Sequence, residues 1–193
     1  QKHGLPHLKM ITLFKTASEV TLQGLPDFFV LKPASLWSGT GVMLLHRISG
    51  LTAYFDAKNN KILTENDIIS ACLRVEQKFQ RTLNFIVEER ALDEDPDKRI
   101  PLDYKVFTFY GVAKFVLQVD RNFSPPRMAF FDGGFDPITD DRVQLNPERP
   151  DTQGQHRKPE CWKEILDLAR QVTIKLEAPF ISVDCYATAR GPL

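Results

Sequence analysis

The chain has 193 residues with 25 basic and 25 acidic side chains, so its formal net charge at pH 7 is zero. This length supports one substantial hydrophobic core, or one domain made of two lobes. The basic residues are spread along the sequence, which argues against nucleic acid or an anionic membrane as the partner. No apolar run approaches the ~20 residues that a membrane-spanning helix needs. The first residues do not show the charged-then-apolar pattern of a signal peptide.

The three cysteines, Cys72, Cys161 and Cys185, are odd in number and widely spaced. This pattern indicates neither a disulfide framework nor a zinc knuckle. We therefore expect three unpaired, buried thiols in a reducing compartment, and predict that the protein is cytoplasmic.

Short apolar runs separated by polar turns predict a series of strands in the first half of the chain. We expect them at 10–14, 28–33, 42–48, 51–57, 61–63 and 83–87, with a brief helical turn near 18–22. Thr64 followed three residues later by Asp67 is typical of a helix start. Apolar residues at helical spacing carry this helix to about residue 80, and we assign its stripe, which includes Ile68 and Cys72, to the core.

The second half of the chain predicts further strands and one helix. The β-rich segments 102–110 and 112–120 meet at Gly111, and strands are also expected at 127–132 and 180–187. A helix over 160–177 is expected to pack on this sheet. Residues 133–159 are rich in Gly, Pro, Asp and Arg and predict a long surface loop in which His156 is a solvated side chain. The acidic residues 93–97 likewise predict a solvated loop.

A glycine-rich loop joins two of the expected strands. Ser38, Gly39, Thr40 and Gly41 follow a strand that carries Lys32 near its end. Glycines allow the backbone to approach a ligand and its N–H groups to face phosphate oxygens, and the lysine supplies a positive charge for the same anion. The spacing is not that of a Walker A loop. By itself the loop is also compatible with a flexible hairpin turn.

Charged side chains share strand faces with apolar ones in the segments 102–110 and 112–120. Side chains alternate along a strand, so Asp103 and Lys105 lie on the same face as Phe107 and Phe109. On the neighbouring segment Arg121 closes an apolar row. Charged groups at the ends of apolar strand faces are costly unless they are paired or bind a ligand. The residues alone therefore predict a sheet whose rim carries a charged pocket.

The order and spacing of these parts resemble the ATP-grasp superfamily, most closely its TupA-like branch, which is associated with cell-surface polymer (teichuronopeptide) biosynthesis. The resemblance rests on an apolar strand ending in Glu88 and Glu89, the run DYKVFTFYGVAKFVLQVDR and a Phe-Phe-Asp strand, and it covers about residues 25–193. It implies an α+β fold of two lobes with largely antiparallel sheets that grip a nucleotide. Residues 1–24 would connect from a preceding domain, 25–90 would form the smaller ATP-binding lobe, and 91–193 the larger lobe.

The resemblance also implies ATP and Mg²⁺ as cofactors and a role for each candidate residue. Lys32 and the loop 38–41 would hold phosphates. Adenosine would be held by Asp103 and by the hinge residues Glu88, Glu89, Arg90 and Ala91. Lys105 and Arg121 would be catalytic cations facing the transferred phosphoryl group, although either could instead form a rim ion pair with Asp103 or Asp120. Asp184, on the last expected strand, would bind Mg²⁺.

Two departures from the family pattern affect the metal site. Ser182 stands where the family often has an arginine. The glutamate that normally serves as the second Mg²⁺ ligand lies on a strand that would follow Leu193. We therefore expect this chain to be a fragment that stops before its last metal-ligand strand.

The resemblance favours an ATP-dependent carboxylate–amine ligase that works through an acyl phosphate. Its substrate would be a small molecule or a polysaccharide precursor, and neither nucleic acid binding nor membrane insertion is expected. Two alternatives stay open. A kinase or phosphotransferase would stop after phosphoryl transfer and release ADP without needing an amine. A non-catalytic module would bind ATP without hydrolysing it.

Overall fold

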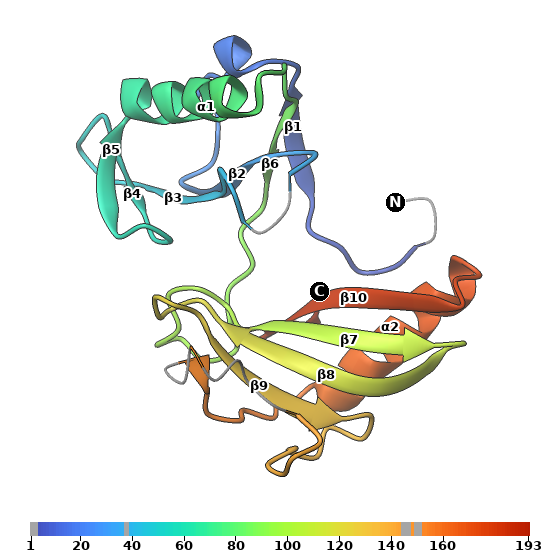
Figure 1. Ribbon diagram of the computed structural model, residues 1–193. Coiled ribbons are helices and arrows are strands. Elements are labelled where there is room, and N and C mark those ends of the chain that lie inside the picture. The colour runs from blue at the N-terminus through green and yellow to red at the C-terminus, as the bar shows by residue number, and fades with distance from the viewer. Residues whose placement is uncertain (1–3, 37–38, 144–147, 149–151) are drawn as a thin grey trace. The chain divides into compact units, whose positions relative to one another are not determined.

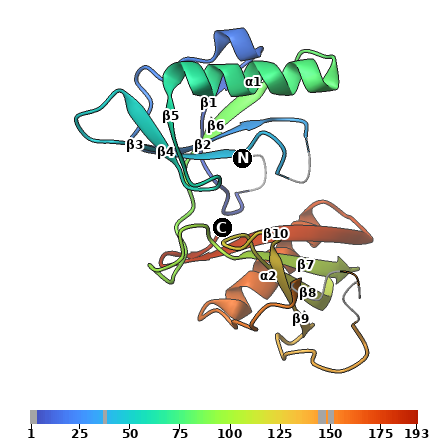
Figure 2. The same cartoon turned by 60° about the vertical axis from the view of Figure 1, so that its left-hand side comes forward.

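The computed structural model describes residues 4–36, 39–143, 148 and 152–193. The chain divides into two compact units, one formed by Leu8–Arg90 and the other by Gln1–His7 together with Ala91–Leu193. Each unit has one β-sheet and one long helix (Figures 1 and 2). Every pairing between the named strands is antiparallel, which confirms the predicted α+β class with antiparallel sheets. Within the described residues, no helix is long and apolar enough to cross a membrane.

The first unit is built on a six-stranded sheet with the order β1-β6-β2-β3-β4-β5. Its strands are β1 (Met10–Phe14), β2 (Phe28–Pro33), β3 (Met43–Arg47), β4 (Ala53–Asp56), β5 (Lys61–Thr64) and β6 (Phe85–Glu88). The prediction of strands at these places is confirmed, with ends that differ by a few residues. Strand β1 is an edge strand that pairs with β6 and is therefore part of this sheet.

Helix α1 (Glu65–Phe79) covers one face of this sheet (Figure 1). Its predicted start is confirmed, because the Thr64 hydroxyl accepts the Asp67 N–H while the Asp67 carboxylate accepts the Thr64 N–H. This reciprocal cap satisfies two helix-end donors. The apolar stripe of the helix buries Ile68 and Cys72 against the strand residues beneath, among them Phe29. A short 3-10 turn, η1 (Ala17–Glu19), packs beside the helix where a brief helical turn was expected.

The second unit is built on a five-stranded sheet with the order β11-β10-β7-β8-β9. Its strands are β7 (Asp103–Phe109), β8 (Val112–Asp120), β9 (Arg127–Asp132), β10 (Phe180–Thr188) and the short β11 (Gly191–Pro192). Helix α2 (Trp162–Lys175) packs on one face through Ile165 and Ala169, which meet Tyr104, Val106 and other buried side chains of the sheet. Among the described residues of this unit, no helix covers the opposite face of the sheet (Figure 2).

Most described residues of the segment between β9 and α2 are exposed, as its composition predicts, but part of the segment packs into the core. Of its described residues, Phe135 is fully buried in the core beneath α2 and Thr152 is also buried. His156 is half-buried with its ring edge against Phe131, so the expectation of a solvated histidine is wrong. The physical reason is that this segment completes the core on the helix-bearing face of the sheet, which composition cannot show.

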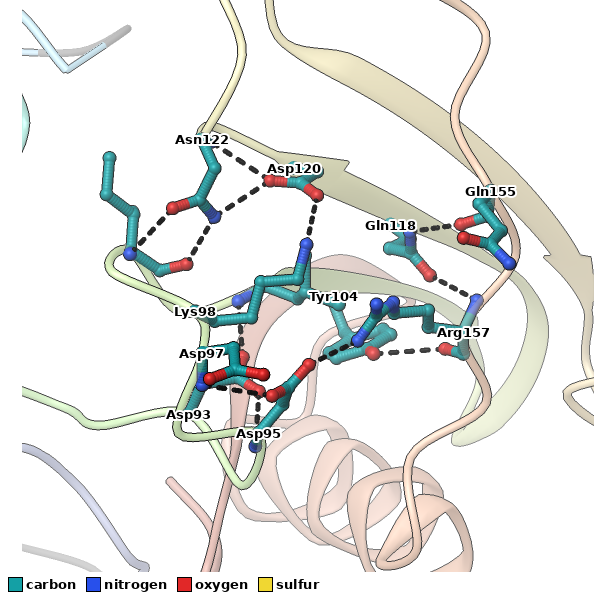
Figure 3. A network of polar contacts seen from close by, with 12 residues as sticks. Asp93, Asp95, Asp97, Lys98, Tyr104, Gln118, Asp120, Asn122, Gln155 and Arg157 are labelled. Atoms are coloured by element: carbon teal, nitrogen blue, oxygen red, sulfur yellow. Dashed lines mark hydrogen bonds and ion pairs between the residues drawn. The ribbon is translucent and has the colours of Figure 1, made fainter.

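A polar network holds the chain around residues 155–157 onto the sheet (Figure 3). The buried amide of Gln118, only 1% exposed, donates to the Gln155 carbonyl oxygen at 2.9 Å and accepts the Arg157 N–H at 2.8 Å. The Tyr104 hydroxyl donates to the Arg157 carbonyl oxygen at 3.0 Å. The Arg157 guanidinium then pairs with Asp95. The acidic loop 93–97 is therefore anchored by this pair, whereas its sequence predicts a solvated segment.

A second part of the same network joins the loop to the end of β8. Lys98 donates to Asp120 at 2.7 Å, and both side chains are largely buried. The Asn122 side chain donates to Asp120 and exchanges two hydrogen bonds with the backbone of Ile100 (Figure 3). Burial alone would raise the pKa of Asp120, but the donors from Lys98 and Asn122 outweigh it and hold that pKa below its ordinary value.

We expect Asp120→Asn to lower the free energy of unfolding by about 2–4 kcal/mol at neutral pH, because it leaves the Lys98 ammonium buried without its counter-charge. A carboxylate whose folded-state pKa is lowered stabilises the fold above its unfolded-state pKa and loses that contribution as pH falls through the folded-state value. The wild-type advantage should therefore be full at pH 7 and shrink below about pH 4. Urea unfolding of both proteins at pH 7 and at about pH 2.5 measures the change, and an equal difference at these two pH values would contradict this account.

The three cysteines are free thiols, as expected, with Cys72 and Cys185 buried and Cys161 half-buried. Burial raises the pKa of Cys72 and of Cys185 to about 12, and it raises that of Cys161 as well.

Since the thiolate is the reactive form, we expect Ellman's reagent at pH 8 to modify Cys161 first. The other two thiols should react only when the protein is unfolded in urea. Rapid reaction of more than one thiol in the native protein would contradict this order.

Candidate functional site

Four charged side chains meet on the helix-free face of the five-stranded sheet. Tyr104 and Val106 point into the core beneath α2, so Asp103 and Lys105, which alternate with them along β7, point to the opposite face. In the antiparallel register Lys105 lies directly opposite Asp184 of β10. Arg121 directly follows Asp120, the last residue of β8. It is two residues beyond Val119, which is the cross-strand partner of Asp103.

Ion pairs link these four side chains into one cluster. Lys105 Nζ lies 2.6 Å from Asp184 Oδ2 and 3.1 Å from Asp103 Oδ2. Arg121 donates to the same Asp103 oxygen at 2.8 Å. The candidates Asp103, Lys105, Arg121 and Asp184 are thus brought together, and the predicted alternative of an ion pair between each cation and Asp103 is present. A pairing of either cation with Asp120 is not found, because Lys98 takes that place.

The two carboxylates of this cluster differ in exposure. Asp103 is 4% exposed, and its Oδ1 atom is buried without a hydrogen-bond partner. Buried polar atoms are usually satisfied, so among the described residues this oxygen is an unusual atom of the cluster. The Asp184 side chain is 58% exposed, which leaves it open to an incoming cation. Asp184 is therefore the carboxylate of this cluster that an ion or a polar ligand can reach.

The exposed Asp184 carboxylate suits Mg²⁺ that arrives with a nucleotide. Mg²⁺ is commonly bound by one or two protein carboxylates together with phosphate oxygens and water. Within the described ranges, no three His, Cys, Asp or Glu side chains converge to hold a metal by themselves. The donor set of this chain fits a cation shared with phosphates rather than a closed protein site.

An aromatic row continues along the same face from the charged cluster. Phe107 stacks on Phe115 with ring centroids 4.2 Å apart, and Phe180 lies beyond them. Phe109 and Phe180 are in contact and are both exposed. Strand alternation predicts this row for Phe107 and Phe109, and the structure adds Phe180 from β10 because that strand pairs with β7.

In the first unit, two candidate residues meet on the helix-free face of the six-stranded sheet. Lys32 on β2 and Glu88 on β6 belong to neighbouring strands and form an ion pair. Glu88 is largely buried, whereas a third of the Lys32 side chain is exposed. The lysine predicted to hold phosphate is thus positioned by the carboxylate predicted to lie at the hinge.

The glycine-rich loop has the backbone freedom that its sequence indicates. Gly39 and Gly41 adopt positive φ values of 68° and 71°. At Gly41 a Cβ atom would lie 2.9 Å from the Pro33 side chain, so a larger residue would displace the loop. Thr40 is half-buried. The remaining candidate of this loop, Ser38, lies outside the described residues.

Lys58, which sequence analysis did not single out, contacts this loop. Its ammonium donates to the Gly39 carbonyl oxygen. The turn that carries it is fixed by the buried Asp56 carboxylate, which accepts the N–H groups of Leu44 and Lys58. A pocket of about 260 Å³ adjoins Gly41, and its lining includes the cations Lys58, Lys61 and Arg74. Lys58 lies between the strands expected at 51–57 and 61–63, and no local sequence signal connects it with the loop 19 residues earlier.

The predicted hinge residues have different surroundings. Glu88 ends β6, while Glu89 accepts the Lys9 N–H with its side chain and donates its own N–H to the Lys9 carbonyl oxygen. The division between the two units falls after Arg90, and Ala91 is buried. The Glu89 side chain is thus engaged in holding the strand that begins the first unit.

No curated protein matches the chain significantly. Among solved structures, the ATP-grasp ligase PsnB complexed with minimal precursor is 12% identical, with a TM-score of 0.45 over 98% of this chain and 46% of that one. PsnB complexed with a phosphomimetic variant of minimal precursor, Mg and ADP is also 12% identical, with a TM-score of 0.43 over 98% of this chain and 43% of that one.

The chain therefore spans less than half the length of those two structures. The family model described as TupA-like ATPgrasp matches residues 5–192, which is nearly the whole sequence. The chain thus belongs to the TupA-like ATP-grasp family.

Proposed function

We propose that this chain is the nucleotide-binding part of an ATP-dependent ligase that activates a carboxylate as an acyl phosphate. The observation that carries the proposal is the cluster of Asp103, Lys105, Arg121 and Asp184 on a helix-free sheet face, in a member of the ATP-grasp family. Fixed cations beside an exposed carboxylate suit phosphoryl transfer, because that reaction depends on positioning and charge stabilisation.

Each group has a defined part in the proposed reaction. On the family resemblance we assign Lys32 and the backbone N–H groups of the glycine-rich loop to the ATP phosphates, and the Asp103 carboxylate to a ribose hydroxyl. Asp184 would hold Mg²⁺, which would supply positive charge to stabilise the phosphate groups. The substrate carboxylate oxygen attacks the γ-phosphorus and ADP leaves. An amine then attacks the acyl carbon and expels phosphate, while Lys105 and Arg121 stabilise the negative charge on the phosphoryl oxygens.

For the acceptor we propose a precursor of a cell-surface polysaccharide or peptide polymer, and this proposal is supported by family membership alone. Such a substrate carries carboxylate or amine groups within a polar molecule. The alternatives are a phosphotransferase that stops at a phosphorylated product and a nucleotide-binding module without turnover.

Trapping the acyl phosphate with hydroxylamine tests the proposed chemistry. The chain is incubated with Mg·ATP, hydroxylamine and a panel of uronic acids and amino acids, and hydroxamate and ADP are measured together. A ligase yields both in equal amounts with one class of carboxylate, and Asp184→Asn should yield neither. ADP with a stable phosphorylated product and no hydroxamate would indicate the phosphotransferase. Calorimetric Mg·ATP binding without any turnover would indicate the non-catalytic module.

A further inference from the structure

Lys105 lies between two carboxylates, Asp184 and Asp103, and forms an ion pair with each. Its ammonium lies closer to Asp184 than to Asp103, at 2.6 Å against 3.1 Å. The contact with Asp184 is built into the fold, because the two residues are direct cross-strand partners in the ladder of β7 and β10. Residues directly opposite in an antiparallel pair have their Cβ atoms about 5 Å apart.

The two cations of the cluster are shared unequally between the two carboxylates. Asp103 is contacted by both Lys105 and Arg121, and it is nearly buried. Within the described part of the chain, the ion pair of Asp184 is with Lys105, and the carboxylate is more than half exposed. Lys105 could leave Asp184 without depriving the buried Asp103 of a counter-ion, since Arg121 remains on the same oxygen. Asp184 is therefore the carboxylate whose cation can be exchanged.

A divalent cation and the Lys105 ammonium compete for the same carboxylate. The ammonium reduces the negative charge at Asp184 and would repel a second cation at that distance. A nucleotide supplies phosphate charge that offsets this repulsion and gives the displaced ammonium a new partner. Binding of the cation is then coupled to binding of the nucleotide.

We propose that Lys105 is an exchangeable counter-ion of Asp184, which blocks divalent-cation binding until a nucleotide is present. This role rests on the proposed function, in which Asp184 holds Mg²⁺ and Lys105 contacts the phosphoryl group. It makes Lys105 a positioning residue for the metal before it acts on the phosphates. This arrangement prevents a divalent cation from binding to Asp184 in the nucleotide-free protein.

Mn²⁺ binding without nucleotide tests the proposal, with electron paramagnetic resonance of free Mn²⁺ as the readout. Wild type should bind weakly. Lys105→Met should bind about tenfold more tightly, because one repelling charge and one competing ion pair are removed. Lys105→Arg should resemble wild type, and the double variant with Asp184→Asn should lose the gain. Lys114→Met, which alters an exposed lysine of the same sheet, is the matched control.

Unchanged or weaker Mn²⁺ binding by Lys105→Met would overturn the proposal, and so would a gain that survives Asp184→Asn. Lys105→Gln gives the same comparison if the methionine variant does not fold. Failure of the proposed function would appear separately, as absence of Mg·ATP binding by the wild type in calorimetry. A nucleotide-free gain in Mn²⁺ binding is measured independently of that result.

Discussion

Lys32→Ala is expected to weaken Mg·ATP binding by about 10- to 100-fold, because a hydrogen bond from a charged donor to phosphate is worth about 1.5–3 kcal/mol. Lys32 is held on the helix-free face of its sheet by Glu88 and remains one-third exposed. An ammonium positioned in this way can move to an incoming phosphate without a change in the backbone. Calorimetric titration of Mg·ATP into both proteins measures the effect.

The matched control for this experiment is Lys15→Ala, since Lys15 is an exposed lysine of the same unit that follows β1. It removes the same charge from the unit and should leave ATP affinity within about twofold, because the charge of an exposed lysine is screened by water and salt. The variant Lys32→Arg should retain part of the affinity, because it keeps the positive charge but not the compact ammonium. Equal weakening by Lys32→Ala and Lys15→Ala would show that the effect is general electrostatics and that Lys32 does not contact the nucleotide.

Asp103→Ala is expected to reduce both stability and turnover. The buried Asp103 carboxylate is the common partner of Lys105 and Arg121. Its loss leaves two cations without that counter-charge and should lower the free energy of unfolding by about 2 kcal/mol, less than for a fully buried pair because both cations are partly exposed. Turnover should fall by about 100-fold, because displaced cations no longer meet the phosphoryl group in the required geometry. Urea unfolding and ADP release measure the two effects.

A control for Asp103 is Asp167→Ala on α2, where the carboxylate forms exposed contacts with Arg170 and Gln171. Exposed helix pairs contribute only about 0.3–0.5 kcal/mol, so turnover should not change. Asp103→Asn separates charge from shape, because the amide fills the same space. If Asp103→Asn had wild-type turnover, the charge of Asp103 would not be needed to position the two cations.

The features of this fold that depend on residues close together in the sequence were predictable from the sequence. The reciprocal cap of Thr64 and Asp67 was visible as a spacing of three residues, because a helix end is satisfied by its own first turn. Strand alternation correctly placed Asp103 and Lys105 on one face, with Phe107 beside them. These features follow from the repeat of 3.6 residues in a helix and of 2 residues in a strand, which sequence spacing reveals directly.

The features that depend on distant segments were not predictable from composition. The segment around Phe135 and His156 looks like a polar surface loop, yet the structure buries part of it against Phe131. Lys58 lies in an ordinary turn, and its contact with Gly39 requires the neighbouring strands to be in place. Such contacts join segments that are far apart in the sequence and depend on how those segments pack. No local sequence pattern therefore predicts them.

By itself the sequence determined the α+β class, the succession of strands and helices, and the family to which the chain belongs. It also determined which charged side chains share a strand face. Only the tertiary structure decided their partners, because Lys105 and Asp184 are 79 residues apart in sequence and meet through the ladder of β7 and β10. That register is set by the packing of both strands on α2, since a slip of one residue would turn every side chain to the other face.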